Sequence, residues 1–314
     1  MLPFSASAEG LELAPGLTLT GDVMLQHSVD AYYEYTDIIA DLRLFWRPVT
    51  DTSFSFGIEA STDSFIGLHE DWSDNGLYAA AVFGFEGYDL RIGAPRPVSD
   101  TMALLPPLGA YRYVSLGVET LHGSVVRGNA RWDDRFTPGL SLQSNTDGAF
   151  AWGLSAHKSS YADQGYRVDV PVVEAVAQYS FGDLTLGAQI VHTRMDDGEA
   201  DQEYPFAVGV SGTSAMIGMR YAKNGWLLGL AHGKADTGDA EQNFSRVHGS
   251  YDFGNGLTLY ADLTKADRLY EDDPSGYQVL GAQYRFANGF YLEAGVTHDR
   301  GEYTHKTIAA GYKF

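Results

Sequence analysis

Residues 290–297 read Phe-Tyr-Leu-Glu-Ala-Gly-Val-Thr, and this stretch decides the fold because apolar side chains alternate in it with polar or very small ones. Phe290, Leu292, Ala294 and Val296 fall on one face, and Tyr291, Glu293, Gly295 and Thr297 fall on the other. A period of two is typical of a β-strand with one apolar face. The C-terminal residues 304–314 repeat the pattern, with Ile308, Ala310, Tyr312 and Phe314 on the apolar face.

The same alternation recurs along the whole chain, in about sixteen runs. An even number of antiparallel strands allows one chain to close its sheet, and about sixteen strands leave room for an aqueous channel. We therefore predict an all-β fold, a transmembrane antiparallel β-barrel, as a single domain over residues 1–314. The predicted strands are 17–27, 37–47, 53–62, 76–86, 87–95, 128–144, 149–158, 171–181, 183–193, 213–222, 225–234, 244–253, 256–266, 277–286, 289–298 and 304–314.

Two kinds of connection alternate between these runs. The short ones, at 181–183, 223–225, 254–256 and 287–289, carry the Gly and Asn residues of tight hairpins. The long ones, at 69–74, 196–201, 236–241 and 271–274, are acidic. Short turns at one end and long polar loops at the other are typical of outer-membrane barrels.

Composition excludes several other classes of protein. Only 21 Lys and Arg face 41 Asp and Glu, which gives a formal net charge of -20 and excludes nucleic acid as a natural partner. The absence of Cys removes disulfide scaffolds and thiol nucleophiles. No apolar run reaches the roughly 20 residues that a spanning helix needs.

Aromatic residues gather beside the short turns. Rings with an apolar body and a polar edge suit a membrane–water boundary, so we predict a girdle at this end of the barrel. The alternative is the ordinary aromatic core of a soluble all-β protein. The predicted girdle residues are Phe181, Trp226, Phe253, Phe286, Phe290 and Phe314.

The chain resembles the general diffusion porins of Gram-negative bacteria, and among them the sixteen-stranded alphaproteobacterial type. The resemblance rests on the terminal Gly311-Tyr312-Lys313-Phe314, on the segment from Tyr88 to Arg96, and on the rhythm of strands and turns. It implies a homotrimer, a third external loop folded inward, and a constriction where basic wall residues face acidic loop residues.

The segment 96–127 is too long for a simple hairpin and is the candidate constriction loop. Four prolines, at 95, 97, 106 and 107, gather at its start and favour a folded-in segment. Strand parity places Arg43, Arg47 and Arg91 on the inner face. We predict that Arg43 and Arg91 face Asp100 and Glu119 of this segment; simple solvation of these charges in a wet interior is the alternative.

No cofactor is expected. The acidic external loops offer oxygen ligands that would suit calcium, but none has EF-hand spacing, so solvated surface charge is the preferred explanation. The nine His residues show no zinc-binding spacing, so no metal site is predicted.

The predicted function is therefore an outer-membrane porin, not an enzyme, for passive diffusion of small hydrophilic solutes and ions. The partners would be those solutes, outer-membrane lipid and two further copies of the chain. The alternatives are an outer-membrane barrel enzyme of lipase or protease type and a soluble all-β carbohydrate-binding module. The nearest approach to a nucleophile motif, Gly153-Leu154-Ser155-Ala156-His157, lacks its last Gly and alternates like a strand.

Overall fold

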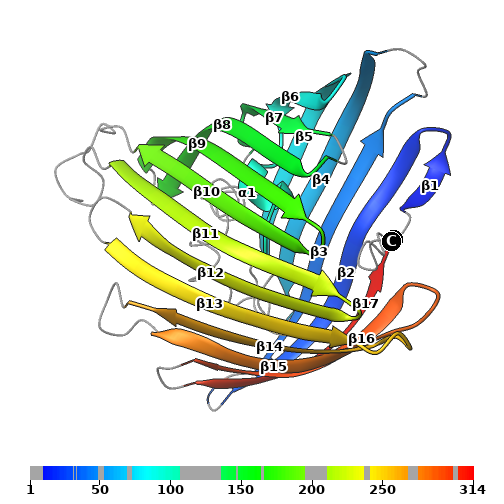
Figure 1. Ribbon diagram of the computed structural model, residues 1–314, viewed down its shortest axis with the longest axis vertical. Coiled ribbons are helices and arrows are strands. Elements are labelled where there is room, and N and C mark those ends of the chain that lie inside the picture. The colour runs from blue at the N-terminus through cyan, green and yellow to red at the C-terminus, as the bar shows by residue number, and fades with distance from the viewer. Residues whose placement is uncertain are drawn as a thin grey trace.

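The chain folds into a closed antiparallel β-barrel of sixteen strands, β2 to β17, with one short additional strand, β1, paired to β2 (Figure 1). Each strand pairs with the next along the chain, and β17 pairs with β2 to close the sheet. The computed structural model describes residues 10–30, 32, 34–48, 53–68, 73–106, 136–145, 148–163, 166–194, 211–236, 241–267, 275–299 and 303–314.

Every predicted run overlaps a strand, which confirms the all-β barrel. The run 128–144 overlaps only at 139–144, since residues 107–135 lie outside the described residues. The strands are β1 (Leu11–Ala14), β2 (Leu17–Val29), β3 (Glu34–Trp46), β4 (Ser55–Gly67), β5 (Ser73–Phe85), β6 (Tyr88–Ala94), β7 (Gly139–Ser144), β8 (Phe150–Asp163), β9 (Tyr166–Phe181), β10 (Leu184–Arg194), β11 (Ser211–Lys223), β12 (Trp226–Asp236), β13 (Glu241–Asp252), β14 (Leu257–Ala266), β15 (Gly276–Arg285), β16 (Phe290–Asp299) and β17 (Thr304–Lys313).

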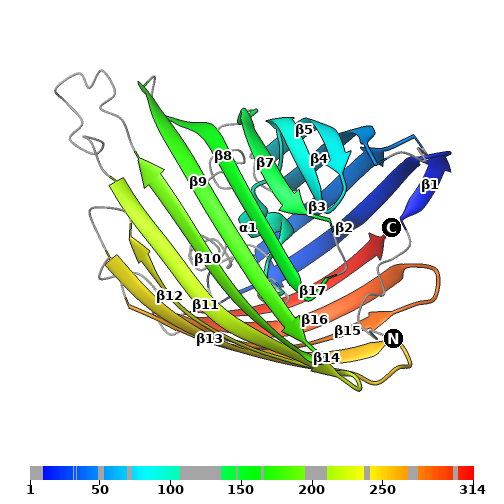
Figure 2. The ribbon, with the colours of Figure 1, turned by 45° about the horizontal axis from the view of Figure 1, so that its top comes forward.

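Two elements escaped the sequence prediction. One is β1, whose four residues are all exposed and therefore carry no two-faced pattern. The other is α1 (Val98–Thr101), a single turn of helix that follows β6 and lies inside the ring of strands in both views (Figures 1 and 2). No helix among the described residues is long and apolar enough to cross a membrane.

The short turns have the predicted chemistry. Lys223 pairs with Trp226, so Asn224 and Gly225 form a two-residue hairpin. Their φ angles of 51° and 86° lie in the left-handed region, where Asn and Gly are the residues that fit most easily. Because the twist of such a turn matches that of the strands, the turn fixes the register between β11 and β12.

The two faces of the wall differ in chemistry along every strand. In β16, Tyr291 and Glu293 are buried and point inward, whereas Leu292 is 46% exposed on the outer surface. Across the barrel many Leu, Ile, Val and aromatic side chains are exposed, while the buried set includes many Asp, Glu, Ser and Thr. A soluble protein would place these two sets the other way round. The apolar face therefore points outward.

The last residue completes the closure of the sheet. The backbone N–H of Phe314 donates to the carbonyl of Gly21 at 2.9 Å. The Phe314 ring contacts that of Tyr312, with 5.0 Å between centroids, and Tyr312 is 42% exposed on the outer face.

Deletion of Phe314 should lower the fraction of chain that reaches the closed barrel, because it removes both the final hydrogen bond and the ring contact. The fraction can be measured by the faster gel migration of the unheated, folded form. Phe314→Tyr keeps both contacts and should assemble normally. Equal assembly of the deleted and full chains would contradict this role of the terminal residue.

Candidate functional site

Three arginines and two acids form a charged patch on the inner face of β3, β4 and β6, which we call the arginine wall: Arg43, Arg47, Arg91, Glu59 and Asp89. Glu59 lies between two of the arginines. Its carboxylate oxygens are 3.3 Å from Arg43 Nε and 3.0 Å from Arg91 Nε. The Glu59 side chain is 8% exposed and that of Arg43 is 37% exposed, so Arg43 presents the accessible edge of this pair.

Asp89 joins the third arginine to the wall. Arg47 Nη2 donates to Asp89 Oδ1 at 3.1 Å, and Arg91 Nη2 lies 3.5 Å from Asp89 Oδ2. Strand parity brings these side chains together, since Arg43 and Arg47 share one face of β3, and Asp89 and Arg91 share one face of β6. With three guanidinium groups and two carboxylates, the wall has an excess of positive charge.

A fourth arginine, Arg96, is almost fully buried where the chain leaves β6. Its guanidinium bonds to both oxygens of Asp41, at 2.6 and 3.1 Å, and to Asp100 at 3.2 Å. It also lies over the ring of Tyr78, 5.2 Å from the centroid. Burial acts to lower the pKa of Arg96, but the ion pairs with Asp100 and Asp41 outweigh burial and raise it. The group is therefore permanently charged and links the segment after β6 to β3.

Residues 95–106, which we call the inner segment, run from β6 along the inner side of β8 and β9. The backbone N–H and hydroxyl of Ser99 both donate to Glu174 Oε2, at 3.1 and 2.9 Å. Gln178 donates to the carbonyl of Met102 at 2.6 Å. Glu174 is fully buried, so its charge depends on these donors. Polar contacts thus hold α1 against the inner face of β9.

Apolar contacts hold the end of the inner segment. Leu104 and Leu105 are 4% and 8% exposed and pack with Met216, Ala231 and Phe244 on the inner side of β11 to β13.

Glycines make room for this contact. A Cβ at Gly187 or Gly218 would come within 3.0 or 2.8 Å of the Leu104 side chain, and one at Gly229 would overlap Leu105. A Cβ at Gly153 would similarly approach Met102. These four inward glycines, Gly153, Gly187, Gly218 and Gly229, form a track on which the inner segment lies.

The opposite side of the interior is also polar. Arg246 Nε donates to Asp262 Oδ1 at 2.7 Å, and His248 Nδ1 lies 2.8 Å from Asp262 Oδ2. Nearer the short turns, Tyr260 donates to Glu293 at 2.6 Å. Charged or hydroxyl-bearing side chains therefore line both sides of the barrel, as solvation by water in the interior would favour.

The predicted constriction residues fall in three places. Arg43, Arg47 and Arg91 lie together in the arginine wall. Asp100 lies beside Arg96, 3.2 Å from its Nη1, and Glu119 lies outside the described residues. That Asp100 and Glu119 face the wall across the pore therefore stays a prediction, as does the path of the whole segment 96–127.

Sequence inspection did not single out the acids that neutralise the wall. Glu59 and Asp89 stand at inward positions of their strands, which the alternation of each strand already indicates. Arg96 and the leucines of the inner segment follow the last strand residue, where parity ends, and only the packed structure reveals their contacts.

The predicted girdle residues lie at the short-turn end. Phe181, Trp226 and Phe253 are each about half exposed. They join neighbouring rings in contacts such as Trp226 with Tyr251 and Phe286 with Phe290, at 4.7 and 5.5 Å between centroids.

No group of metal-binding side chains occurs within the described ranges. The acidic loops that could hold calcium fall largely outside those ranges, so calcium binding there stays a prediction.

Arg96→Gln should lower the free energy of unfolding by about 1–3 kcal/mol, because Asp41 and Asp100 lose their charged partner. It should also make the inner segment more sensitive to limited proteolysis. Arg47→Gln is the matched control; its side chain is 31% exposed and its loss should cost less than about 1 kcal/mol. If both variants unfold alike in urea and resist protease alike, Arg96 does not anchor the segment.

Comparison with known proteins points to one fold. No protein-family model matches the chain, and no curated protein sequence matches it. Solved structures of mutants of the Rhodopseudomonas blastica porin do match, with TM-scores of 0.66, 0.63 and 0.62 at 15% sequence identity. The matches cover 95% of this chain and 100% of those chains. The chain therefore has the fold of a sixteen-stranded bacterial porin.

Proposed function

We propose that this protein is an outer-membrane porin, a water-filled channel through which small hydrophilic solutes and ions diffuse passively. The observation that carries the proposal is the charged and polar interior of a closed barrel whose outer face is apolar. A sixteen-stranded barrel is wide enough to hold water, and charged side chains in its interior stay hydrated, whereas on a lipid face near the bilayer centre each would cost about 2–4 kcal/mol.

The barrel is oriented with its short turns toward the periplasm and its long loops outward, as in outer-membrane barrels generally. The aromatic girdle at the short-turn end then lies at the inner water boundary of the membrane. Rings such as Trp226 and Phe253 suit that boundary because an apolar body and a polarisable edge are both satisfied there.

The narrowest part of the pore lies between the arginine wall and the segment 96–127. The described start of this segment supports the assignment, because Arg96, Ser99 and Leu105 all bind inward-facing parts of the wall. Acidic side chains of the segment opposite Arg43 and Arg91 would set up a transverse field, which favours polar solutes over apolar ones of equal size.

The proposed assembly is a homotrimer. Ala79 and Ala81, on the outer face of β5, are small and would allow a neighbouring barrel to approach closely. Cross-linking of the protein in its membrane tests the trimer separately, and the proposed channel does not depend on the result.

Reconstituted into a planar bilayer, the protein should give stepwise conductance with a weak preference for cations at about 0.1 M salt. The net charge of -20 concentrates counter-ions at the mouth of the pore, and added salt should erode the preference by screening. Hydrolysis of lipid or peptide without any conductance would instead favour a barrel enzyme. Anion preference at low salt would show that the arginine wall outweighs the net charge.

Replacing Arg43 and Arg91 together by Ser should raise cation selectivity and alter the conductance, because Glu59 then loses both of its cationic partners. The control is Arg285→Ser, which removes an inward charge at the short-turn end of β15 and should change selectivity less. Reversal potentials measured in a salt gradient compare the two. Unchanged selectivity and conductance in the double variant would place the constriction elsewhere.

A further inference from the structure

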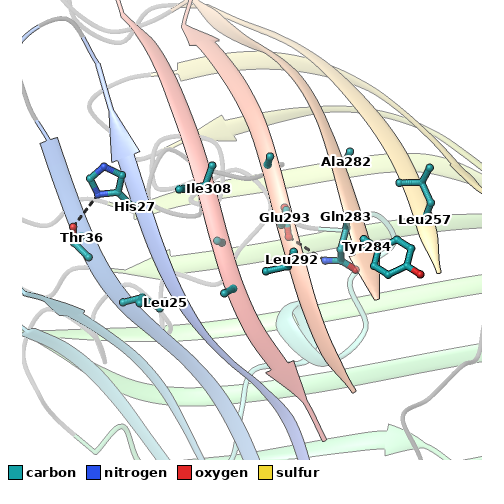
Figure 3. A pocket seen from close by; sticks show the side chains of 13 residues that line it. Leu25, His27, Thr36, Leu257, Ala282, Gln283, Tyr284, Leu292, Glu293 and Ile308 are labelled. Carbon is teal, nitrogen blue, oxygen red and sulfur yellow. Dashed lines mark hydrogen bonds between the residues drawn. The ribbon is translucent and has the colours of Figure 1, made fainter. Parts of the chain in front are cut away.

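The outer face of the barrel carries a groove of about 520 Å³ that crosses β14 to β17, β2 and β3. Its lining is almost entirely apolar, with Leu257 and Tyr284 near one end and His27 and Thr36 at the other (Figure 3). The volume is in the range of sites that hold a small organic molecule. No cofactor or solute role proposed above uses this groove.

The groove exists because small side chains meet along neighbouring strands. Ala282 of β15 faces Ala294 of β16, and Ala310 of β17 faces Leu25 of β2. Larger residues border this row; Leu280 and Ile308 are 67% and 61% exposed. The groove therefore has alanine methyl groups at its base and branched apolar side chains along its sides, which suits a flexible hydrocarbon chain.

The end of the groove toward the long loops is polar and basic. His27 Nδ1 lies 3.0 Å from the hydroxyl of Thr36 at this end. Two residues beyond Ile308, on the same face of β17, is the exposed Lys306. On β16 the exposed His298 contacts the hydroxyl of Thr304 through its Nδ1 at 2.9 Å, so Nε2 is the ring nitrogen that this contact does not use. Lys306 and His298 thus stand beside the polar end of an apolar groove.

Positively charged side chains gather on the outer face near the long-loop ends of the strands, although the chain as a whole is acidic. Among the residues of β2 to β17 with described side chains, Glu34 is the only outward-facing acid, and it lies 3.6 Å from His27. Among the same residues, outward cations recur near the long-loop ends of the strands: Lys158, Arg194, Lys234, Lys265 and Lys306. These cations stand on the strands, below the acidic long loops, and favour an anionic lipid headgroup at that level of the outer face.

We propose that the groove binds an acyl chain of a phosphate-bearing lipid of the leaflet at the long-loop end, with the phosphate held by Lys306 and His298. The inference rests on the proposed membrane function, which makes that leaflet the outer one, formed in Gram-negative bacteria by a phosphorylated glycolipid. A lysine close to an anionic headgroup adds electrostatic attraction, and the groove supplies apolar contact for the chain.

The groove is tested by filling it. Ala294→Trp and Ala310→Trp should reduce binding of purified phosphorylated lipid A to the barrel by about tenfold or more, as measured by native mass spectrometry in a mild detergent. Ala188→Trp, at an exposed outward position of β10, is the matched control and should bind like the unmodified chain. Unchanged binding in the two groove variants would overturn the proposal.

The phosphate contact is tested separately. Lys306→Gln should weaken binding of phosphorylated lipid A by about fivefold, the factor that corresponds to about 1 kcal/mol. His298→Ala should also weaken it, because the ring nitrogen no longer contacts the phosphate. Neither change should affect binding of dephosphorylated lipid A. Lys223→Gln, an outward lysine at the short-turn end, should have no effect. Equal losses for both lipids would overturn the role of the phosphate.

Two further measurements separate this inference from the channel itself. Conductance of all these variants should equal that of the unmodified chain, so a barrel that binds lipid A but never conducts would count against the channel alone. If the Trp variants lose an oligomer in native mass spectrometry while lipid binding persists, the groove is an interface with a second copy, and the lipid proposal is wrong.

Discussion

The hydrogen bonds between β17 and β2 are the contacts on which the rest of the structure depends. An open sheet of this size would leave two edges of unpaired backbone groups, which a hydrocarbon environment cannot tolerate. Closure removes both edges and gives every strand one inner and one outer face. Because side chains alternate strictly between these faces, a shift of the register by one residue would exchange the apolar belt for the charged interior. Closure and side-chain chemistry therefore require each other.

Two features organise the interior. Acidic residues neutralise the inward arginines, and glycines leave room for the inner segment. Glu59 and Asp89 lie among three arginines, and a buried arginine, Arg96, links the segment after β6 to Asp41 on β3. Farther along, Leu104 and Leu105 lie against glycines of the barrel wall and pack with Met216, Ala231 and Phe244. The inner segment is thus held by ion pairs at its start and by close packing at its end. These two kinds of contact differ in their response to salt, which screens the first and leaves the second largely intact.

The architecture was accessible from sequence because it follows from local patterns. Alternation in residues such as 290–297 and turns such as Asn224-Gly225 each depend on neighbours close in the chain, and together they predicted nearly every strand. The contacts of the candidate site were less accessible. Arg96 meets Asp41, 55 residues earlier, and Ser99 meets Glu174, 75 residues later. Parity tells which face a side chain occupies but does not tell which partner it meets across the barrel.

The glycine track limits which amino-acid substitutions the barrel wall accepts during evolution. On a lipid-exposed wall, one branched apolar residue replaces another with little consequence, and most positions of the outer face have that freedom. Gly187, Gly218 and Gly229 have less of this freedom, because an added methyl group would press on the leucines of the inner segment and, at Gly218, also on the carbonyl oxygen of Leu230. Positions of the barrel wall that contribute no side chain are therefore among those that the inner segment constrains. In a family of such barrels, glycines at these wall positions would mark the path of the inner segment even where the residues of the segment itself differ.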